Sequence, residues 1–115
     1  MIKKEDMAEL KMITGGIEEF KTELANAGDK PVFVDFMADW CGNCELILPK
    51  LEVMNETLGE AAVFLKVDVD EQEDVAEEYE VTSLPRMICF KNGEKVGEMQ
   101  GNKPEKYEEF INANK

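Results

Sequence analysis

Apolar and polar positions along the chain follow two periods, one typical of strands and one of helices. The periods alternate in a way that predicts the order β-α-β-α-β-α-β-β-α. A short strand over Lys11–Thr14 comes first, and a helix follows in which apolar residues recur at Ile17, Phe20, Leu24 and Ala27. Because strands alternate with helices, we expect an α/β fold with a mainly parallel sheet, closed by an antiparallel hairpin and covered by helices on both faces.

The run Val32–Met37 is apolar except for Asp35, which is typical of a central strand buried on both faces. A helix is expected to begin at the cysteines that follow and to extend to about Leu58, with Pro49 kinking it. Its inner face is predicted to be Leu48, Leu51, Met54 and Leu58. The remaining elements are expected at Val63–Asp68 (strand), Gln72–Tyr79 (helix), Met87–Lys91 and Lys95–Gln100 (strands), and from Pro104 onward (helix).

Composition limits the kinds of protein that this chain can be. With 115 residues, it is long enough for one domain, which we expect at residues 11–115 after a flexible extension at residues 1–10. A net charge of −13 argues against nucleic acid or an anionic membrane as partner. The densest acidic run, Asp68–Glu80, is interpreted as a solvated helix face.

Cysteine and histidine usage narrows the chemistry further. Three cysteines do not form a secreted disulfide framework, and no apolar signal segment is found at the start, so we expect a reducing, cytoplasmic location. The absence of histidine removes Ser/His/Asp and Cys/His catalysis together with the commonest metal ligand.

The central motif is Trp40-Cys41-Gly42-Asn43-Cys44, placed between a buried strand and a helix, which is typical of a redox dithiol. At a helix N-terminus, unpaired N–H groups and the positive end of the helix dipole favour the Cys41 thiolate. We therefore expect Cys41 to attack and Cys44 to resolve the mixed disulfide. Two alternatives are a pair of structural cysteines and a zinc site. Zinc requires four ligands, and Cys89 is the only other cysteine, so we expect no metal.

A carboxylate inside an apolar strand must be paired, hydrogen-bonded or protonated, and this applies to Asp35. Burial would raise its pKa and make it a candidate proton acceptor for the resolving thiol, with Lys66 in the next strand as counter-charge. The alternative is an internal salt bridge that serves structure only. Pro85, at the entry to a strand, indicates a special turn in which a cis bond can occur. Cys89, in the middle of that strand, is interpreted as a core residue.

Several motifs in this order resemble the thioredoxin family over about Lys11 to Asn114. They are Val34–Cys44, Pro49, Lys66–Asp70, Leu84-Pro85, Phe90–Gly93 and Val96-Gly97. The segments Asp68–Val81 and Lys95–Gly101 look most like the eukaryotic cytosolic branch.

The resemblance implies a thioredoxin fold, with a five-stranded mixed sheet flanked by four helices. It implies a general protein disulfide reductase and redox carrier that acts on disulfide-containing client proteins. Such a protein holds no bound cofactor and receives electrons from NADPH through a thioredoxin reductase. We expect it to be a monomer.

By position, the resemblance makes Cys41 the nucleophile, Cys44 the resolving thiol, and Asp35 the assisting carboxylate with Lys66 as its partner. Pro85 would be a cis-proline that faces the disulfide. The residues expected to bind substrate in a shallow groove are Trp40, Gly42, Asn43, Val69, Leu84, Pro85, Arg86 and Gly101.

Three residues depart from the family pattern. Asn43 stands where the family usually has proline, giving C-G-N-C in place of C-G-P-C. Glu45 replaces a common lysine and disfavours a nearby thiolate. Arg86 replaces a threonine and places a cation that could offset Glu45 or select acidic substrates. These departures motivate two further hypotheses: a more oxidising, isomerase-like or substrate-dedicated oxidoreductase, and a non-catalytic binding module.

Overall fold

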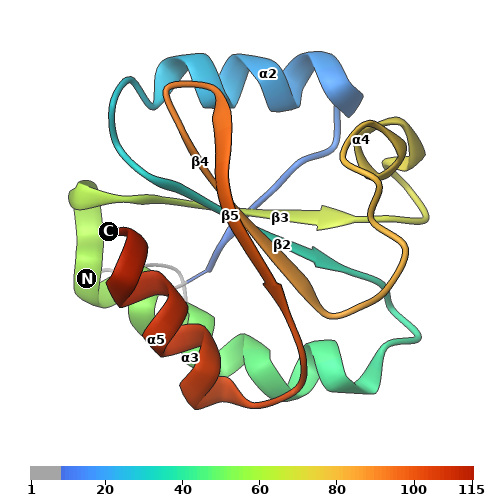
Figure 1. The fold of residues 1–115 in the computed structure, drawn as a ribbon. Coiled ribbons are helices and arrows are strands. Elements are labelled where there is room, and N and C mark those ends of the chain that lie inside the picture. The colour runs from blue at the N-terminus through green and yellow to red at the C-terminus, as the bar shows by residue number, and fades with distance from the viewer. Residues whose placement is uncertain (1–8) are drawn as a thin grey trace, which may run out of the picture.

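The computed structural model describes residues 9–115, and it confirms the predicted order of elements (Figure 1). The strands are β1 (Lys11–Met12), β2 (Val32–Met37), β3 (Val63–Asp68), β4 (Arg86–Lys91) and β5 (Glu94–Gln100). The helices are α2 (Gly16–Asn26), α3 (Gly42–Leu58), α4 (Glu73–Glu78) and α5 (Pro104–Asn114), with a 3-10 turn at Gly59–Ala61. No helix in this part of the chain is long and apolar enough to cross a bilayer.

The five strands form one mixed sheet in the order β1-β3-β2-β4-β5, as the resemblance implied. β1 and β2 run parallel to β3, whereas β4 is antiparallel to both β2 and β5. The expectation of a mainly parallel sheet is therefore wrong. The contacts of α4 explain it: the Gln72 Oε1 accepts the backbone N–H of Gly16 (2.8 Å), and the Asp74 Oδ2 accepts that of Ile17 (2.9 Å). These contacts hold the start of α4 at the start of α2, at the end of the sheet where β1 and β3 finish. The chain therefore enters β4 from that end and runs antiparallel to β2.

Helices α2 and α4 cover one face of the sheet, and α3 and α5 cover the other (Figure 1). β2 lies at the centre and contributes to both layers: Val34 and Phe36 pack on the α2/α4 face, and Phe33 packs on the α3/α5 face. The alternation of a strand places Asp35 on the same face as Phe33, under α3. The central strand thus carries its one acidic residue toward the helix that begins at the cysteines.

The buried face of α3 differs in part from the prediction. Leu51 and Met54 are buried, but Leu48 and Leu58 lie half-buried at the edge, and Ile47 takes the central position. The reason is the helix start: Cys44 points inward, and the positions 44, 47, 51 and 54 continue that direction. The helix continues without a break through Pro49.

The start of the chain is described only from Glu9 onward. Residues 1–8, which make up most of the expected flexible extension, lie outside the described residues. Leu10 is 8% exposed and packs in the core of the α3/α5 face, so the core already includes the residue before the expected domain start at Lys11. The expected strand Lys11–Thr14 is regular only over Lys11–Met12.

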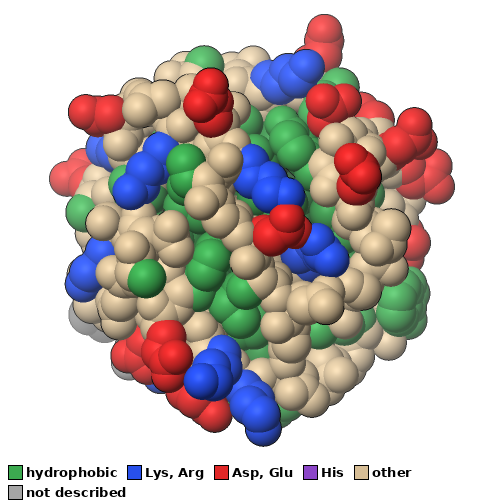
Figure 2. Space-filling view, viewed as in Figure 1, with side chains coloured by type: hydrophobic (Ala, Val, Ile, Leu, Met, Phe, Trp, Pro, Cys, Tyr) green, Lys and Arg blue, Asp and Glu red, His purple; other side chains and the backbone are tan. Residues whose placement is uncertain are grey.

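The acidic run lies on the surface, as predicted. Seven of its carboxylates, at positions 70, 71, 73, 74, 77, 78 and 80, are exposed, and acidic side chains gather over α4 in Figure 2. Asp68 is the exception: it is 5% exposed, and its Oδ1 accepts hydrogen bonds from the backbone N–H groups of Asp70 (2.9 Å) and Glu71 (3.2 Å). The buried carboxylate shapes the loop after β3, which lies next to the cysteines.

Candidate active site at Cys41 and Cys44

Cys41 is the N-cap of α3, and it forms a disulfide with Cys44 across a Cα–Cα distance of 5.3 Å. Both residues are nearly buried, with 6% and 4% exposure. The backbone N–H of Cys44 donates to the Cys41 Sγ at 3.1 Å. This helix N-terminus therefore directs a hydrogen-bond donor and its positive dipole end at the first sulfur, where both would stabilise a thiolate.

Trp40 lies beside the disulfide with 70% of its surface exposed. Its indole Nε1–H donates to the Asp70 Oδ2 at 2.8 Å, which holds the ring against the loop after β3. The backbone N–H of Val69 donates to the carbonyl of Met37 at 2.9 Å, so this loop is also held to the end of β2. The sequence does not predict this contact, because Asp70 belongs to the acidic run that is interpreted as solvated surface.

The Leu84–Pro85 peptide bond is cis, as the resemblance implied. Leu84 and Val69 pack against the small cluster formed by Ala38, Cys41 and Cys44. The structure thus brings these two predicted groove residues to the disulfide.

Gly101 follows the end of β5. Because Arg86 pairs with Gln100 in the antiparallel β4–β5 ladder, Gly101 comes next to Pro85 at the same end of the sheet. Its carbonyl accepts a hydrogen bond from the Tyr107 hydroxyl at 2.7 Å. The sequence predicts Tyr107 only as an inner residue of the last helix, and no sequence pattern indicates the contact of its hydroxyl with Gly101.

Asp35 is 1% exposed, and its Oδ1 has no hydrogen-bond partner among residues 9–115. A cavity of about 160 Å³ connects it with Cys44 and Lys66, and Asp39 and Glu45 also line this cavity. Burial raises the pKa of Asp35 to about 7, and the positive charge of Lys66 only partly opposes this shift. A carboxyl of this kind exchanges protons near neutral pH, directly beside the second cysteine.

Lys66 lies opposite Asp35 on the neighbouring strand. No ion pair within 4.0 Å joins the two side chains in the described part of the chain. Lys66 therefore acts on Asp35 through its charge at a longer distance, and the contact expected of an internal salt bridge is not formed.

Arg86 is held by residues of β5 and the preceding loop. Its guanidinium forms an ion pair with Glu98 and donates to Gln100 Oε1 (3.0 Å) and Ser83 Oγ (3.3 Å). Among residues 9–115, no hydrogen bond or ion pair joins it to Glu45. The pairing of β4 with β5 places Glu98 beside this cation, so its charge is compensated there; that it offsets Glu45 or selects acidic substrates stays a prediction.

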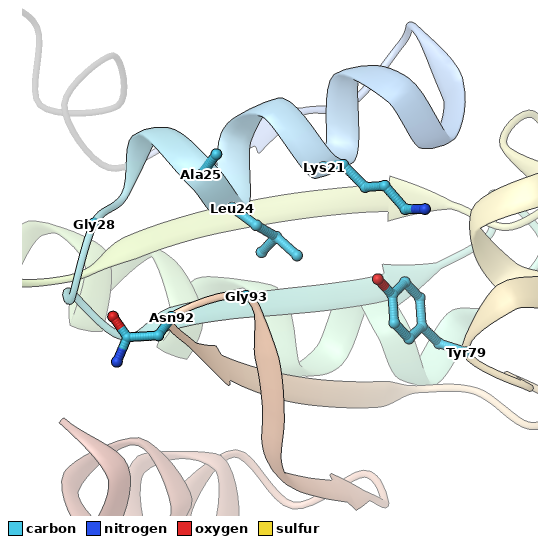
Figure 3. Close-up of a pocket in the computed structure, with 7 residues that line it drawn as sticks. All are labelled: Lys21, Leu24, Ala25, Gly28, Tyr79, Asn92 and Gly93. Atoms are coloured by element: carbon cyan, nitrogen blue, oxygen red, sulfur yellow. The ribbon is translucent and has the colours of Figure 1, made fainter.

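Other features do not belong to this site. No group of three or more potential ligand side chains in residues 9–115 is arranged to hold a metal ion. A separate cavity of about 490 Å³ lies between α2 and the β4–β5 turn, where Lys21, Leu24, Tyr79 and Asn92 are among its lining residues (Figure 3). It contains none of the predicted site residues.

Comparisons with known proteins agree with the fold. The model of the thioredoxin family matches residues 11–113. The thioredoxin of Homo sapiens is 47% identical over 93 residues, which cover 81% of this chain and 88% of that protein. The thioredoxin of Ophiophagus hannah is 44% identical over 99 residues, 86% of this chain and 93% of that protein.

Solved structures give the same result. The X-ray structure of Fasciola hepatica thioredoxin superposes with a TM-score of 0.87 and 31% identity, covering 92% of this chain and 100% of that chain. Malassezia sympodialis thioredoxin gives a TM-score of 0.84 and 36% identity, with 92% and 90% covered. The chain therefore belongs to the thioredoxin family, as a thiol-disulfide oxidoreductase that reduces protein disulfides through the redox-active pair Cys41–Cys44.

Proposed function

We propose that this chain is a general redox carrier of the eukaryotic cytosolic thioredoxin type, in which Cys41 attacks client disulfides and Cys44 resolves them. The observation that carries this order is the 3.1 Å hydrogen bond from the Cys44 N–H to the Cys41 Sγ at the start of α3. Only the first cysteine is the N-cap of the helix, so the helix N-terminus favours its thiolate over that of Cys44.

The reaction proceeds in two exchanges. The Cys41 thiolate attacks one sulfur of the client disulfide, the client S–S bond breaks, and the released client thiolate takes a proton from water. Cys44 then transfers its proton to the Asp35 carboxylate and attacks the Cys41 Sγ. The Cys41–Cys44 bond forms as the mixed disulfide breaks, and the second client thiolate leaves and is protonated. Two electrons pass to the client.

Asp35 suits the second exchange because its pKa lies near the working pH. With a pKa of about 7, a substantial fraction is ionised and able to accept a proton, and the acid formed releases it easily. The cavity that joins Asp35, Cys44 and Lys66 supplies the path to solvent, and Lys66 favours the ionised carboxylate.

We assign the groove for the client backbone to Trp40, Gly42, Asn43, Val69, Leu84, Pro85, Arg86 and Gly101. The packing of Val69 and Leu84 against the disulfide supports this assignment. Arg86 contributes to it indirectly, because its guanidinium is bound to Glu98, to Ser83 just before Leu84 and to Gln100 just before Gly101. That compensated charge also removes one of the observations that favoured a non-catalytic binding module.

Electrons are proposed to come from NADPH through a thioredoxin reductase, with no cofactor held by this chain and with the chain acting as a monomer. One related structure is a complex of ferredoxin:thioredoxin reductase with thioredoxin f2, so a relative binds its reductase directly. We propose a cytoplasmic location. Because another relative is the mitochondrial thioredoxin 3 of Saccharomyces cerevisiae, cell fractionation is the test of this part.

The order of attack is tested with two matched variants, Cys41→Ser and Cys44→Ser. Each is assayed with NADPH, a purified eukaryotic thioredoxin reductase and insulin as disulfide substrate. Cys41→Ser should abolish turnover without forming any adduct, whereas Cys44→Ser should accumulate a mixed disulfide with insulin, visible by mass spectrometry. Equal loss without trapping in both variants would contradict the order.

A more oxidising or substrate-dedicated oxidoreductase is the second candidate, and Glu45 is the observation that favours it. Its side chain lines the cavity that contains Asp35 and Cys44, so its charge lies near the resolving thiol. Equilibration of the dithiol with glutathione separates the two candidates. A reduction potential of about −230 mV or higher, the range of glutaredoxins and protein disulfide isomerase, would favour the oxidising type, and a value of about −270 mV would favour the reductase.

A further inference from the structure

The outward face of α3 carries large apolar side chains that the fold does not bury. Leu46 and Val53 are 56% and 52% exposed, and Trp40, just before the helix, is 70% exposed. The remaining exposed large hydrophobic residues of the described chain, Met12 and Val96, lie on strands. Three of the five therefore lie on the redox helix or immediately before it.

Leu46 and Val53 belong to one continuous stripe along α3. At 100° per residue, Gly42, Leu46, Pro49 and Val53 lie on a single face of α3, opposite the buried residues Cys44, Ile47, Leu51 and Met54. All four are exposed, and we call them the outer stripe. With a rise of about 1.5 Å per residue, the stripe extends about 16 Å from Gly42 to Val53.

The outer stripe is continuous with the surface at which exchange takes place. Gly42 lies between the two cysteines, so any protein that reaches Cys41 covers the beginning of the stripe. A standard interface buries about 800 Å² on each partner, which corresponds to a round patch with a radius of about 16 Å. A partner centred on the disulfide therefore reaches as far as Val53.

Charges border the stripe unevenly. Glu45, Glu52 and Glu56 lie along one side of it, by their positions on the helix. On the other side, Lys50 is paired with Glu108 of α5 at 3.1 Å. A partner that covers the stripe would therefore meet carboxylates along one border, which basic side chains would complement.

We propose that the outer stripe docks the reductase that recharges Cys41–Cys44, through an apolar surface of that reductase bordered by basic side chains. This inference rests on the proposed function, in which the electrons come from a thioredoxin reductase. Client proteins share an accessible disulfide but differ in the surface around it. The reductase presents the same surface in every turnover, so a fixed stripe that extends about 16 Å from the cysteines can be complementary to it.

The test compares Leu46→Ser/Val53→Ser with Val96→Ser, a matched control that removes a 48%-exposed apolar side chain from β5. Each protein is assayed at varied concentration with NADPH and a purified eukaryotic thioredoxin reductase, and separately with dithiothreitol and insulin. We expect the double variant to raise the reductase KM about tenfold. The reductase kcat and the dithiothreitol-driven rate should stay within twofold of wild type, and the control should change neither value.

A second arm tests the border. Glu52→Lys/Glu56→Lys should also raise the reductase KM, and the increase should diminish in high salt because the contact is electrostatic. An unchanged KM in the apolar variant overturns the assignment of the stripe but leaves the proposed electron source in place. If the reductase and NADPH fail to reduce the wild-type chain, both the proposed electron source and the assignment of the stripe are overturned. A wild-type dimer at assay concentration that the apolar variant dissociates would assign the stripe to a second copy and overturn the proposal.

Discussion

The two faces of the central sheet are built from different kinds of residue. The core on the α2/α4 face includes Phe20, Phe36 and Phe90, and the buried polar Gln72 at the start of α4 is hydrogen-bonded to the start of α2. The core on the α3/α5 face is also largely apolar, but it additionally buries the Cys89 thiol and the Tyr107 side chain, and the Asp35 carboxyl points to this side. The first face contains none of the predicted redox residues, whereas the second accommodates a carboxyl that a folding core does not need.

Other buried polar residues show that this difference concerns the redox site. The Gln72 Oε1 accepts the backbone N–H of Gly16 at 2.8 Å, and the Asp68 Oδ1 accepts two backbone N–H groups. Both residues are therefore satisfied by the fold. Asp35 has an oxygen without a partner in the described chain, and it lies beside Cys44. Unsatisfied burial is costly, and in the described chain it occurs at two side-chain atoms, Asp35 Oδ1 and Arg86 Nε. The first of these lies where a proton acceptor is needed.

The largest effect on stability is expected on the α2/α4 face. Phe20 is fully buried and packs edge-on against Phe90, with ring centroids 5.6 Å apart. Phe20→Ala should lower the free energy of unfolding by about 3–5 kcal/mol, measured by urea denaturation of the oxidised protein. The rate of insulin reduction per folded molecule should stay within twofold of wild type.

Phe20→Leu is the milder control and keeps the chain folded if the alanine variant is too unstable. A several-fold loss of exchange rate in the folded leucine variant would contradict the separation of the two faces.

On the other face, Asp35→Asn should increase stability in a pH-dependent way. Because the pKa of Asp35 is raised to about 7, the folded chain binds this proton more tightly than the unfolded chain, and wild-type stability falls as the pH rises from about 4 to about 7. The rise of this pKa from its ordinary value to about 7 corresponds to a loss of about 4 kcal/mol of folding free energy at high pH. The asparagine variant, which has no carboxyl to ionise, avoids the full loss only above pH 7. The difference in unfolding free energy should widen by about 2–3 kcal/mol between pH 5 and pH 8.

The same variant should slow exchange, because no carboxylate then accepts the proton of Cys44. We expect a loss of about tenfold or more in insulin reduction near neutral pH. Lys66→Met is the matched comparison: it keeps the carboxyl but removes the charge that lowers its pKa, so the pH dependence should move upward. Rates that stay equal to wild type in Asp35→Asn between pH 5 and pH 8 would leave Asp35 without a catalytic role.

Local patterns determined what could be predicted from the sequence. Val32–Met37, the helix after Cys41 and the burial of Asp35 follow from short apolar periods and one acidic residue inside them. Contacts between strands do not follow from such patterns. The pairing of Arg86 with Glu98 depends on the β4–β5 register, and the missing contact between Asp35 and Lys66 depends on side-chain directions on neighbouring strands.

Tyr107→Phe should have a smaller effect, confined to the groove. It removes the 2.7 Å hydrogen bond to the carbonyl of Gly101, which lies next to Pro85 at the end of the sheet. Stability should fall by about 0.5–1.5 kcal/mol, because the exposed Gly101 can bind water instead. If the hydroxyl positions the groove, the KM for insulin rises several-fold while kcat stays constant. A fall in kcat without a change in KM would contradict this.

The smallest effect is expected at Cys89, which lies on the α3/α5 face but outside the redox site. Burial raises the pKa of this thiol to about 11, and the side chain is fully buried, so little reactive thiolate forms at neutral pH. In the oxidised protein, where Cys41 and Cys44 are bonded, iodoacetamide should label no cysteine in the native state and one in urea. Cys89→Ala should label in neither state and keep wild-type turnover. Labelling of the native oxidised chain would show that the polar groups of this face are open to solvent beyond the Asp35 cavity.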